Sequence, residues 1–246
     1  MPLESMMASY TWSSPTVEQI RARLEKYDIR ASQTIPDSVH AHLCRSSVLV
    51  PLFFRNDTLH VLLTLRSASL RHHASTVAFP GGRKNEDDVD DVATALREAE
   101  EEIGLPPSQV EVVSCLGPTF FRPNYSAFPV VGFIPDGFKP VPNTDEVEFV
   151  FSVPLARFLQ KDFATTETAL LGRKMFIWHF PCETERGEIS VWGGTAWICV
   201  LLAAIVYQET LSIPLYNNSA SSSDLAKYLE DFFVYMSENT KSQHKL

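Results

Sequence analysis

The sequence contains few cysteines, and none of them lie close together. The four cysteines form no CxxC pair and are widely scattered: Cys44, Cys115, Cys182 and Cys199. We therefore expect neither a zinc site nor a disulfide scaffold. Positive charge is also scarce, because the 246-residue chain has a formal net charge of -9. A protein that coats nucleic acid needs a basic surface, so we expect no nucleic-acid partner.

Long hydrophobic segments are missing as well. The N-terminus lacks a basic stretch followed by an apolar one, which argues against a secretory signal. The longest apolar run covers 12 residues, 196–207, whereas a membrane-spanning helix needs roughly 20. We interpret this run as a buried helix and expect no membrane span.

The remaining composition is that of an ordinary globular protein, with 45% hydrophobic and 21% charged residues. Strand patterns occur at 46–54, 59–66, 76–79, 110–117 and 127–134, and helix patterns at 15–27, 89–103, 195–207 and 223–236. The first two strands flank the turn residues Asn56 and Asp57, which predicts a hairpin. Strands interleaved with helices predict an α/β or α+β layered domain.

The helix predicted at 89–103 carries a cluster of glutamates. On a helical wheel its apolar residues share one side: Val92, Leu96, Ala99 and Ile103. We expect the acidic residues to fall together on the opposite side: Glu98, Glu101 and Glu102. Just before this helix, Pro80-Gly81-Gly82 allows the backbone to bend closely between a strand and the helix.

These glutamates have two interpretations. The first is a solvated acidic face on a helix that packs into the core. Against it, Glu98 repels Glu101 and Glu102, each pair by a few tenths of a kcal/mol. The acidic residues also crowd the C-terminal half of the helix, where the macrodipole favours cations. The second interpretation is a divalent metal site, because Mg²⁺ binds hard oxygen ligands and would remove both penalties.

The segment REAEEEIGL at 97–105, preceded by PGG at 80–82, resembles the Nudix box, whose core is Arg-Glu-apolar-any-Glu-Glu-any-Gly-apolar. One departure is a loop longer by one residue, so that the loop glutamate of the box falls on Val89, with Asp87, Asp88 and Asp90 around it. The longer loop is typical of the coenzyme A pyrophosphatase branch. Four further segments resemble that branch: LLTLRSASLRHHASTVAFPGG, FPVVGFI, NTDEVEFVFSVPL and WGGTA. Ser75 and Thr76 depart from its usual residues.

The resemblance implies a Nudix-type α/β/α sandwich with a mixed central sheet. We expect an N-terminal extension with a short helix at 1–38, the Nudix domain at 39–210, and a C-terminal helix with a polar tail at 211–246. The implied reaction is metal-dependent hydrolysis of the diphosphate bond of coenzyme A or acyl-CoA to 3',5'-ADP and (acyl-)4'-phosphopantetheine. Two alternatives stay open: another nucleoside diphosphate substrate, such as ADP-ribose or a dinucleotide, or a non-catalytic nucleotide-binding module.

The resemblance also assigns residues. It places Mg²⁺ or Mn²⁺ on Glu98, Glu101 and Glu102, with Glu101 as a further ligand or as the base that activates water. Arg97 would orient these carboxylates, and Glu146 would be an additional base, unless it is a solvated loop carboxylate. Residues near the box are the candidates for substrate binding: Arg66, Arg71, Gly81, Gly82 and Arg83.

The chain ends in His244-Lys245-Leu246, which resembles the peroxisomal address Ser-Lys-Leu. This similarity predicts a peroxisomal location and an import receptor as a partner. An arbitrary polar C-terminus is the alternative, with a cytoplasmic or mitochondrial location.

Overall fold

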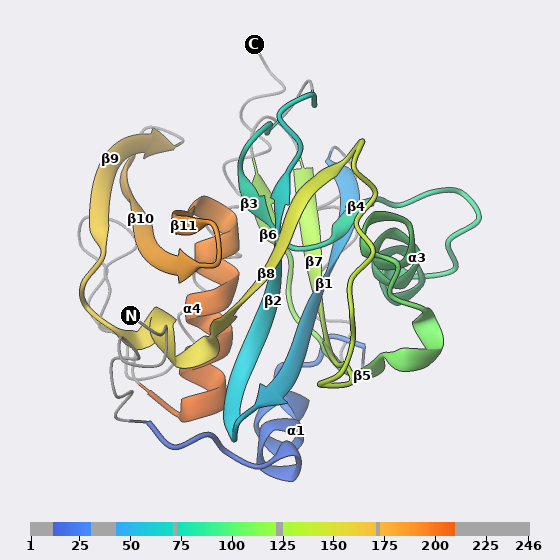
Figure 1. The fold of residues 1–246 in the computed structure, drawn as a ribbon, viewed down its shortest axis with the longest axis horizontal. Helices are drawn as coiled ribbons and strands as arrows, with labels where there is room; N and C mark the ends of the chain where they lie inside the picture. Colours follow the sequence, from blue (N-terminus) through green and yellow to red (C-terminus); the bar gives the residue numbers. More distant parts are fainter. Residues whose placement is uncertain (1–11, 31–42, 71–72, 122–124, 171–172, 210–246) are drawn as a thin grey trace.

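The computed structural model describes residues 12–30, 43–70, 73–121, 125–170 and 173–209 (Figure 1). Three predictions lie outside these residues: the helix at 223–236, the substrate contact of Arg71, and the C-terminal tail.

The predicted hairpin is confirmed as β1 (Cys44–Arg55) and β2 (Thr58–Arg66). The two strands pair antiparallel, with Leu52 opposite Val61 and Arg55 opposite Thr58. Asn56 and Asp57 form the turn with φ values of 48° and 58°. A two-residue turn with positive φ at both positions matches the twist of the strands, and Asn and Asp tolerate this conformation better than most residues.

The central sheet has the strand order β3-β2-β1-β7-β5, and β4, β6 and β8 pair with β1, β7 and β2. The added strands are β3 (Val77–Ala78), β4 (Gly81–Arg83), β5 (Glu111–Cys115), β6 (Thr119–Phe121), β7 (Tyr125–Phe133) and β8 (Val147–Pro154). β1 and β7 run parallel, with Val50 opposite Val131, whereas the other pairs are antiparallel. The sheet is therefore mixed, as predicted.

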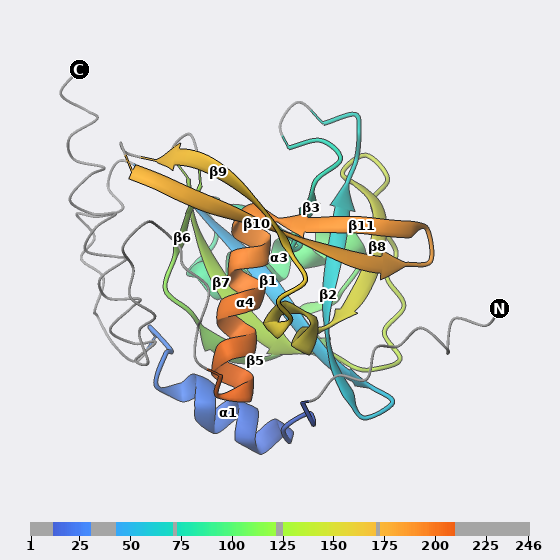
Figure 2. The ribbon, with the colours of Figure 1, turned by 90° about the vertical axis from the view of Figure 1, so that its left-hand side faces the viewer.

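A second sheet has the order β11-β10-β9. Its strands are β9 (Ala164–Leu170), β10 (Arg173–Thr184) and β11 (Gly187–Trp192). Helix α4 (Gly193–Tyr207) follows β11 directly and lies between this sheet and the central one (Figures 1 and 2). Helix α1 (Val17–Glu25) contacts α4, and Ile20 and Leu24 of α1 are fully buried in the same core.

The helices begin where side chains can cap them. Thr16 and Gln19 form a capping box at α1, so this helix begins just after the predicted position. Helix α3 (Asp91–Ile103) begins two residues later than predicted, because Asp90 caps it by accepting a hydrogen bond of 2.7 Å from the Ala93 N–H. Two short 3₁₀ turns complete the described elements: η2 (Pro107–Gln109) and η3 (Leu155–Leu159).

Side chains alternate across the central sheet and form two apolar layers. Val61 and Leu63 of β2 belong to the cluster that contains α4, whereas Leu62 between them belongs to the cluster that contains Ala95 and Ala99 of α3. Figure 1 shows α4 and α3 on opposite sides of the sheet, which confirms the α/β/α sandwich.

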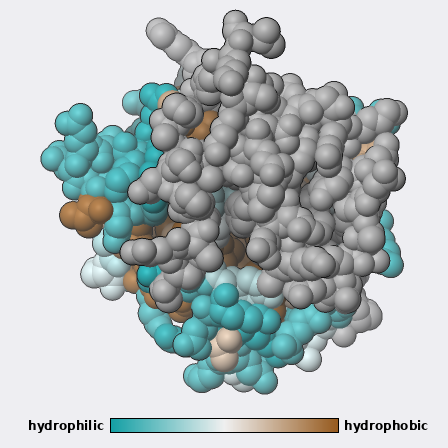
Figure 3. All heavy atoms as spheres, turned by 180° about the vertical axis from the view of Figure 1, so that it is seen from behind, coloured by the Kyte–Doolittle hydropathy of each residue, from teal (hydrophilic) through white to brown (hydrophobic). Residues whose placement is uncertain are grey.

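The apolar run at 196–207 is a buried helix, as predicted, since 196–206 of α4 are all buried. Nowhere in the described part of the chain does a helix combine the length and apolar character needed to cross a membrane. Cys115, Cys182 and Cys199 are buried free thiols, and Cys44 is half-buried. Seen from behind, the described surface is mostly hydrophilic, with apolar atoms in small separate patches (Figure 3).

Candidate active site

The candidate site forms where β1 and β2 separate. β2 pairs with β1 only over Leu52–Arg55; further along, β3 pairs with β2 and β4 pairs with β1. The connection from β3 to β4 crosses this gap and brings Gly81 and Gly82 against α3. A Cβ atom at Gly82 would lie 2.5 Å from the carboxylate of Glu98, and one at Gly81 would lie 2.4 Å from the Ser47 carbonyl oxygen. Gly81 therefore needs glycine because the backbone of β1 leaves no room for a side chain, whereas a side chain at Gly82 would require the Glu98 carboxylate to move.

Glu102 does not lie on a solvated face. Its exposed fraction is only 2%, so the interpretation of the glutamates as a solvated acidic face does not hold for this residue. One of its oxygens accepts a hydrogen bond of 3.2 Å from the Gly81 N–H, and the other lies 3.5 Å from Nη1 of Arg66. Burial raises the pKa of Glu102 to about 7, and the charges of Glu98 and Glu146 act in the same direction.

Arg97 connects the glutamates to Asp88, a residue with no role expected from the sequence. Its Nε and Nη2 donate to the two oxygens of Asp88, each at 3.0 Å, and Nη2 also donates to the Arg83 carbonyl at 3.0 Å. Its Nη1 lies 2.9 Å from Glu98 and 3.1 Å from Glu101. This pairing holds the pKa of Asp88 well below its usual range and raises the pKa of Arg97.

The length of the loop before α3 could have identified Asp88 as the acidic residue of the box. Counted back from Arg97, the acidic position of the box falls on Val89, whose exposed fraction is 87%. Counted forward from Gly82 through the longer loop, the same position falls one residue earlier, on Asp88. Asp88 is buried and also accepts hydrogen bonds from the Asn85 N–H at 2.8 Å and the Thr94 hydroxyl at 3.0 Å. Asp88, which was given no role from the sequence, is therefore the acidic loop residue that contacts Arg97.

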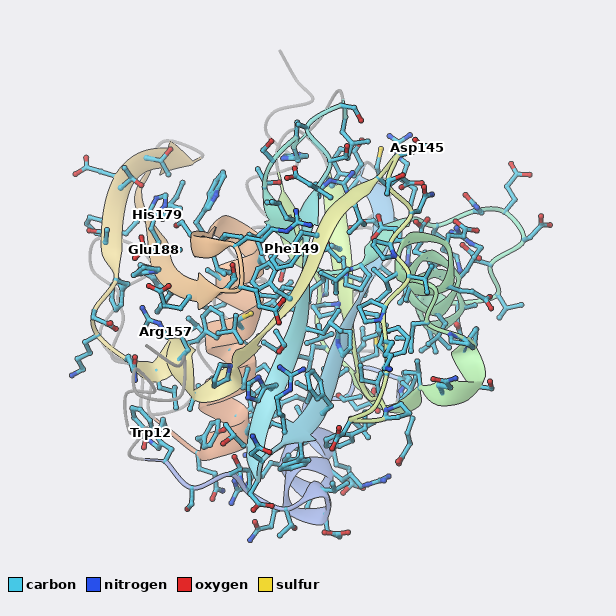
Figure 4. The ribbon with its side chains drawn as sticks, in the orientation of Figure 1. Trp12, Asp145, Phe149, Arg157, His179 and Glu188 are labelled. Atoms are coloured by element: carbon cyan, nitrogen blue, oxygen red, sulfur yellow. The ribbon has the colours of Figure 1, made fainter. Side chains whose placement is uncertain are left out.

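Glu146 reaches the site from the connection between β7 and β8. The Asn143 N–H donates to the Glu102 carbonyl at 2.9 Å, and the Glu146 N–H donates to the Asn143 carbonyl at 3.0 Å. The Ser67 N–H donates to the Glu146 carbonyl at 2.9 Å, which ties this connection to the end of β2. Figure 4 shows the preceding residue, Asp145, at the end of β8 that lies beside α3.

The four glutamates interact electrostatically. Burial raises the pKa of Glu98, and the charges of Glu101 and Glu146 raise it further, although Arg97 lowers it. The side chain of Glu101 is 54% exposed, so it faces solvent at the edge of the cluster. The structure thus brings Glu98, Glu102 and Glu146 into one acidic group, with Glu101 at its rim.

The side chain of Arg83, a predicted substrate contact, points away from the acidic group. Its Nη2 donates to the Tyr125 hydroxyl at 3.0 Å and to the Cys44 sulfur at 3.4 Å. Only its carbonyl joins the site, through Arg97.

The acidic group has the chemistry of a site for a hard cation. Within the described ranges, no group of three or more His, Cys, Asp or Glu side chains is placed so that it could already hold a metal ion. The donors nevertheless fit a divalent metal ion, because Glu98 and Glu102 place carboxylate oxygens beside Gly81 and Gly82. Burial raises the pKa of both carboxylates, and the charge of Glu98 raises the pKa of Glu102 further, whereas Arg97 and Arg66 lower them.

Comparisons with known proteins indicate one family. A family model described as the NUDIX domain matches residues 45–172. The chain is 36% identical over 222 residues to the mouse (Mus musculus) protein named peroxisomal coenzyme A diphosphatase NUDT7, covering 89% of this chain and 91% of that protein. It is 42% identical over 169 residues to the mitochondrial Nudix hydrolase 15 of Arabidopsis thaliana, covering 67% of this chain and 59% of that protein. A crystal structure of a MutT/nudix family protein from Enterococcus faecalis covers 78% of this chain and 75% of its own, with 15% identity and a TM-score of 0.42.

Proposed function

This chain belongs to the Nudix hydrolase family, and from that premise we propose that it hydrolyses the diphosphate bond of coenzyme A or acyl-CoA. The products would be 3',5'-ADP and (acyl-)4'-phosphopantetheine. The observation that carries the proposal is the buried carboxylate of Glu102 beside Gly81 and Glu98. The substrate is supported by the name of the Mus musculus relative, most of whose length this chain matches.

We assign the metal to the acidic group. Glu98 and Glu102 would hold Mg²⁺ or Mn²⁺, with Glu101 as a further ligand or as the base. The bound ion would supply charge neutralisation on the phosphoryl oxygens. Glu146, whose carbonyl accepts a hydrogen bond from the Ser67 N–H, is the candidate for an additional base that takes a proton from water.

Arg97 acts in this proposal as a positioning residue. Its guanidinium is held by both oxygens of Asp88, so its remaining N–H groups fix the orientation of Glu98 and Glu101. The substrate contacts are assigned to Gly81, Gly82 and Arg66, which border the acidic group, and to Arg71 and Arg83. Arg83 would leave Tyr125 to reach a phosphate.

A substrate panel tests the proposal. The purified chain is incubated with Mg²⁺ or Mn²⁺ and, separately, with coenzyme A, an acyl-CoA, ADP-ribose and a diadenosine polyphosphate, and the products are separated by chromatography. We expect 3',5'-ADP from the first two at the highest rates. Much faster cleavage of ADP-ribose or of the dinucleotide would refute the substrate. Binding without cleavage of any of them would favour the non-catalytic alternative.

We also propose a peroxisomal location. It is supported by the name of the Mus musculus relative and by the resemblance of His244-Lys245-Leu246 to a peroxisomal address. The chain with a fluorescent reporter at its N-terminus is expected in peroxisomes through the import receptor, and deletion of the last three residues should make the signal diffuse. A diffuse signal from the undeleted chain would refute the proposal.

A further inference from the structure

Two arginines balance the charge of the acidic group, and they are held in different ways. Arg97 is held by partners other than the glutamates. Both oxygens of Asp88 accept hydrogen bonds from it, and the Arg83 carbonyl accepts a third. The guanidinium of Arg66 has one partner among the described residues, Glu102. Arg97 is therefore fixed, whereas Arg66 can leave its partner without breaking another contact of its side chain within this part of the chain.

The backbone at Arg66 is anchored, so only its side chain is able to move. The Arg66 N–H donates to the Thr76 carbonyl at 3.0 Å, and its carbonyl accepts from the Ser75 N–H at 3.2 Å. The pairing of β2 with β8 shifts register between Leu65 and Arg66. The extra residue at this shift is Glu148 of β8, and Arg66, the last residue of β2, extends its side chain to Glu102.

The contact between Arg66 and Glu102 is loose for a buried ion pair. The atoms lie 3.5 Å apart, whereas a charged N–H to carboxylate hydrogen bond is about 2.8 Å long. The side chain of Glu102 is 2% exposed and that of Arg66 is 22% exposed, so the guanidinium lies on the solvent side of the pair. A divalent cation on Glu98 and Glu102 would repel it, because two positive charges would then compete for one carboxylate.

We propose that Arg66 is an exchangeable counter-cation: it neutralises Glu102 while no divalent ion is bound, and it moves to the diphosphate of the substrate when an ion binds. This inference rests on the proposed metal-dependent function. It adds to that function a direct competition between Arg66 and the metal, followed by a substrate contact that forms only in the metal-loaded site.

Metal binding without substrate tests the competition. Mn²⁺ is titrated calorimetrically into the intact chain and into Arg66→Gln, Arg66→Lys and the control Arg55→Gln, a position at the far end of β1. We expect Arg66→Gln to bind Mn²⁺ about tenfold more tightly, because one competing charge near a divalent ion is removed. Arg66→Lys should keep the affinity of the unsubstituted chain, and Arg55→Gln should not change it. Thermal unfolding of each variant checks that it is folded.

Steady-state kinetics test the second half of the exchange. With saturating Mn²⁺, KM for coenzyme A should rise about tenfold in Arg66→Gln while the metal binds more tightly. A residue that only supports the structure would weaken both, and one that only binds substrate would leave the metal affinity unchanged; either result overturns the inference.

The two proposals can fail separately. If the chain cleaves coenzyme A but Arg66→Gln does not bind Mn²⁺ more tightly, only the exchange is wrong. If Arg66→Gln binds Mn²⁺ more tightly but no diphosphate is cleaved, the competition holds and the proposed reaction is wrong. If no variant binds Mn²⁺, both are refuted.

Discussion

The two faces of the central sheet are built from different kinds of residues. On the face toward α4, β2 contributes Leu59, Val61 and Leu63, which are all fully buried. On the face toward α3, the same strand contributes His60 and Thr64 on either side of Leu62. Helix α4 is buried over 196–206 without a charged residue, whereas α3 buries Asp91 and Glu102.

The face toward α4 therefore serves mainly the stability of the fold, and the face toward α3 carries the chemistry of the site. Burial of apolar surface stabilises the fold by roughly 25 cal/mol per Å², and the face toward α4 consists of little else. On the face toward α3, buried carboxylates lose their hydration and need arginines or a cation to compensate. We therefore expect substitutions in α4 to lower stability and substitutions in α3 to lower activity.

The largest effect is expected from Glu102→Gln. The substitution keeps the shape of the side chain and removes a charged metal ligand, so turnover should fall by about 10³-fold. The free energy of unfolding in metal-free buffer should not fall, because a buried charge is lost. Rates and denaturant unfolding curves measure the two effects. Glu100→Gln is the matched control, since Glu100 is exposed on the same helix. Unchanged turnover in Glu102→Gln would contradict the assignment of the site.

The converse experiment is Leu202→Ala in α4. Leu202 is fully buried, and its truncation leaves a cavity, so the free energy of unfolding should fall by about 3 kcal/mol. The kcat of the folded protein should stay within a factor of about two, because no residue of the acidic group contacts this side of the sheet. Leu202→Met, which keeps the volume, should lose much less stability. A large drop in kcat with intact folding would show that the two faces are coupled.

The elements that were predicted correctly have strong local patterns. The hairpin of β1 and β2 combines β-rich runs with a turn of Asn56 and Asp57, and α4 is apolar throughout. Strands β8 to β11 were not predicted. β9 is exposed along Thr165–Glu167 at a sheet edge, so it has no buried face to produce alternation, and β10 contains Pro181. In these strands tertiary pairing overrides a weak local preference.

Residue spacing could predict only the part of the site whose residues are neighbours in the sequence, whereas Glu146 was named through the resemblance. Helical spacing brought Glu98, Glu101 and Glu102 together, and the glycines before them were noted for their close backbone approach. The ion pair of Arg66 with Glu102 and the pairing of Arg97 with Asp88 were not predicted from the sequence. These contacts join the end of β2, a loop and a helix, and their geometry depends on the gap between β1 and β2.

A polar residue on the face toward α3 should make stability depend on pH. Burial lowers the pKa of His60 from 6.5 to about 4, and the charge of Arg55 adds to the effect. Because the folded-state pKa lies below the unfolded value, the unfolded chain binds the proton first as the pH falls. His60 therefore costs no stability above about pH 6.5, and a growing penalty appears between pH 6.5 and 4.

His60→Gln tests this penalty. Unfolding in denaturant at pH 7.5 and at pH 4.5 should show that the substituted chain loses about 2–3 kcal/mol less between the two conditions. Glutamine can still reach the Ser152 hydroxyl, which lies 3.4 Å from Nδ1 of His60. Equal losses of stability in both chains would show that the pKa of His60 is the same in the folded and the unfolded state. No equivalent titrating residue lies among the β2 residues that face α4, so a substitution there should leave the pH dependence unchanged.

The smallest expected effect in this series distinguishes a positioning role from a structural one. In Asp88→Asn, Arg97 loses the charged carboxylate that accepts two of its hydrogen bonds. The N–H groups of Arg97 that orient Glu98 and Glu101 are then no longer fixed. We expect kcat to fall about tenfold with KM nearly unchanged, because the substrate does not touch Asp88. The free energy of unfolding should fall by about 1–2 kcal/mol, since a buried pair is weakened.

If Asp88 only stabilised the loop, kcat of the folded fraction would stay constant while the unfolding midpoint fell. Asp88→Glu, which keeps the charge, should recover part of kcat in the positioning case. Asp87→Asn changes an exposed neighbour in the same loop and should alter neither quantity. Asp88 lies between the loop and α3. If Asp88→Asn lowers both kcat and the free energy of unfolding, this one residue serves both the chemistry of the site and the stability of the fold.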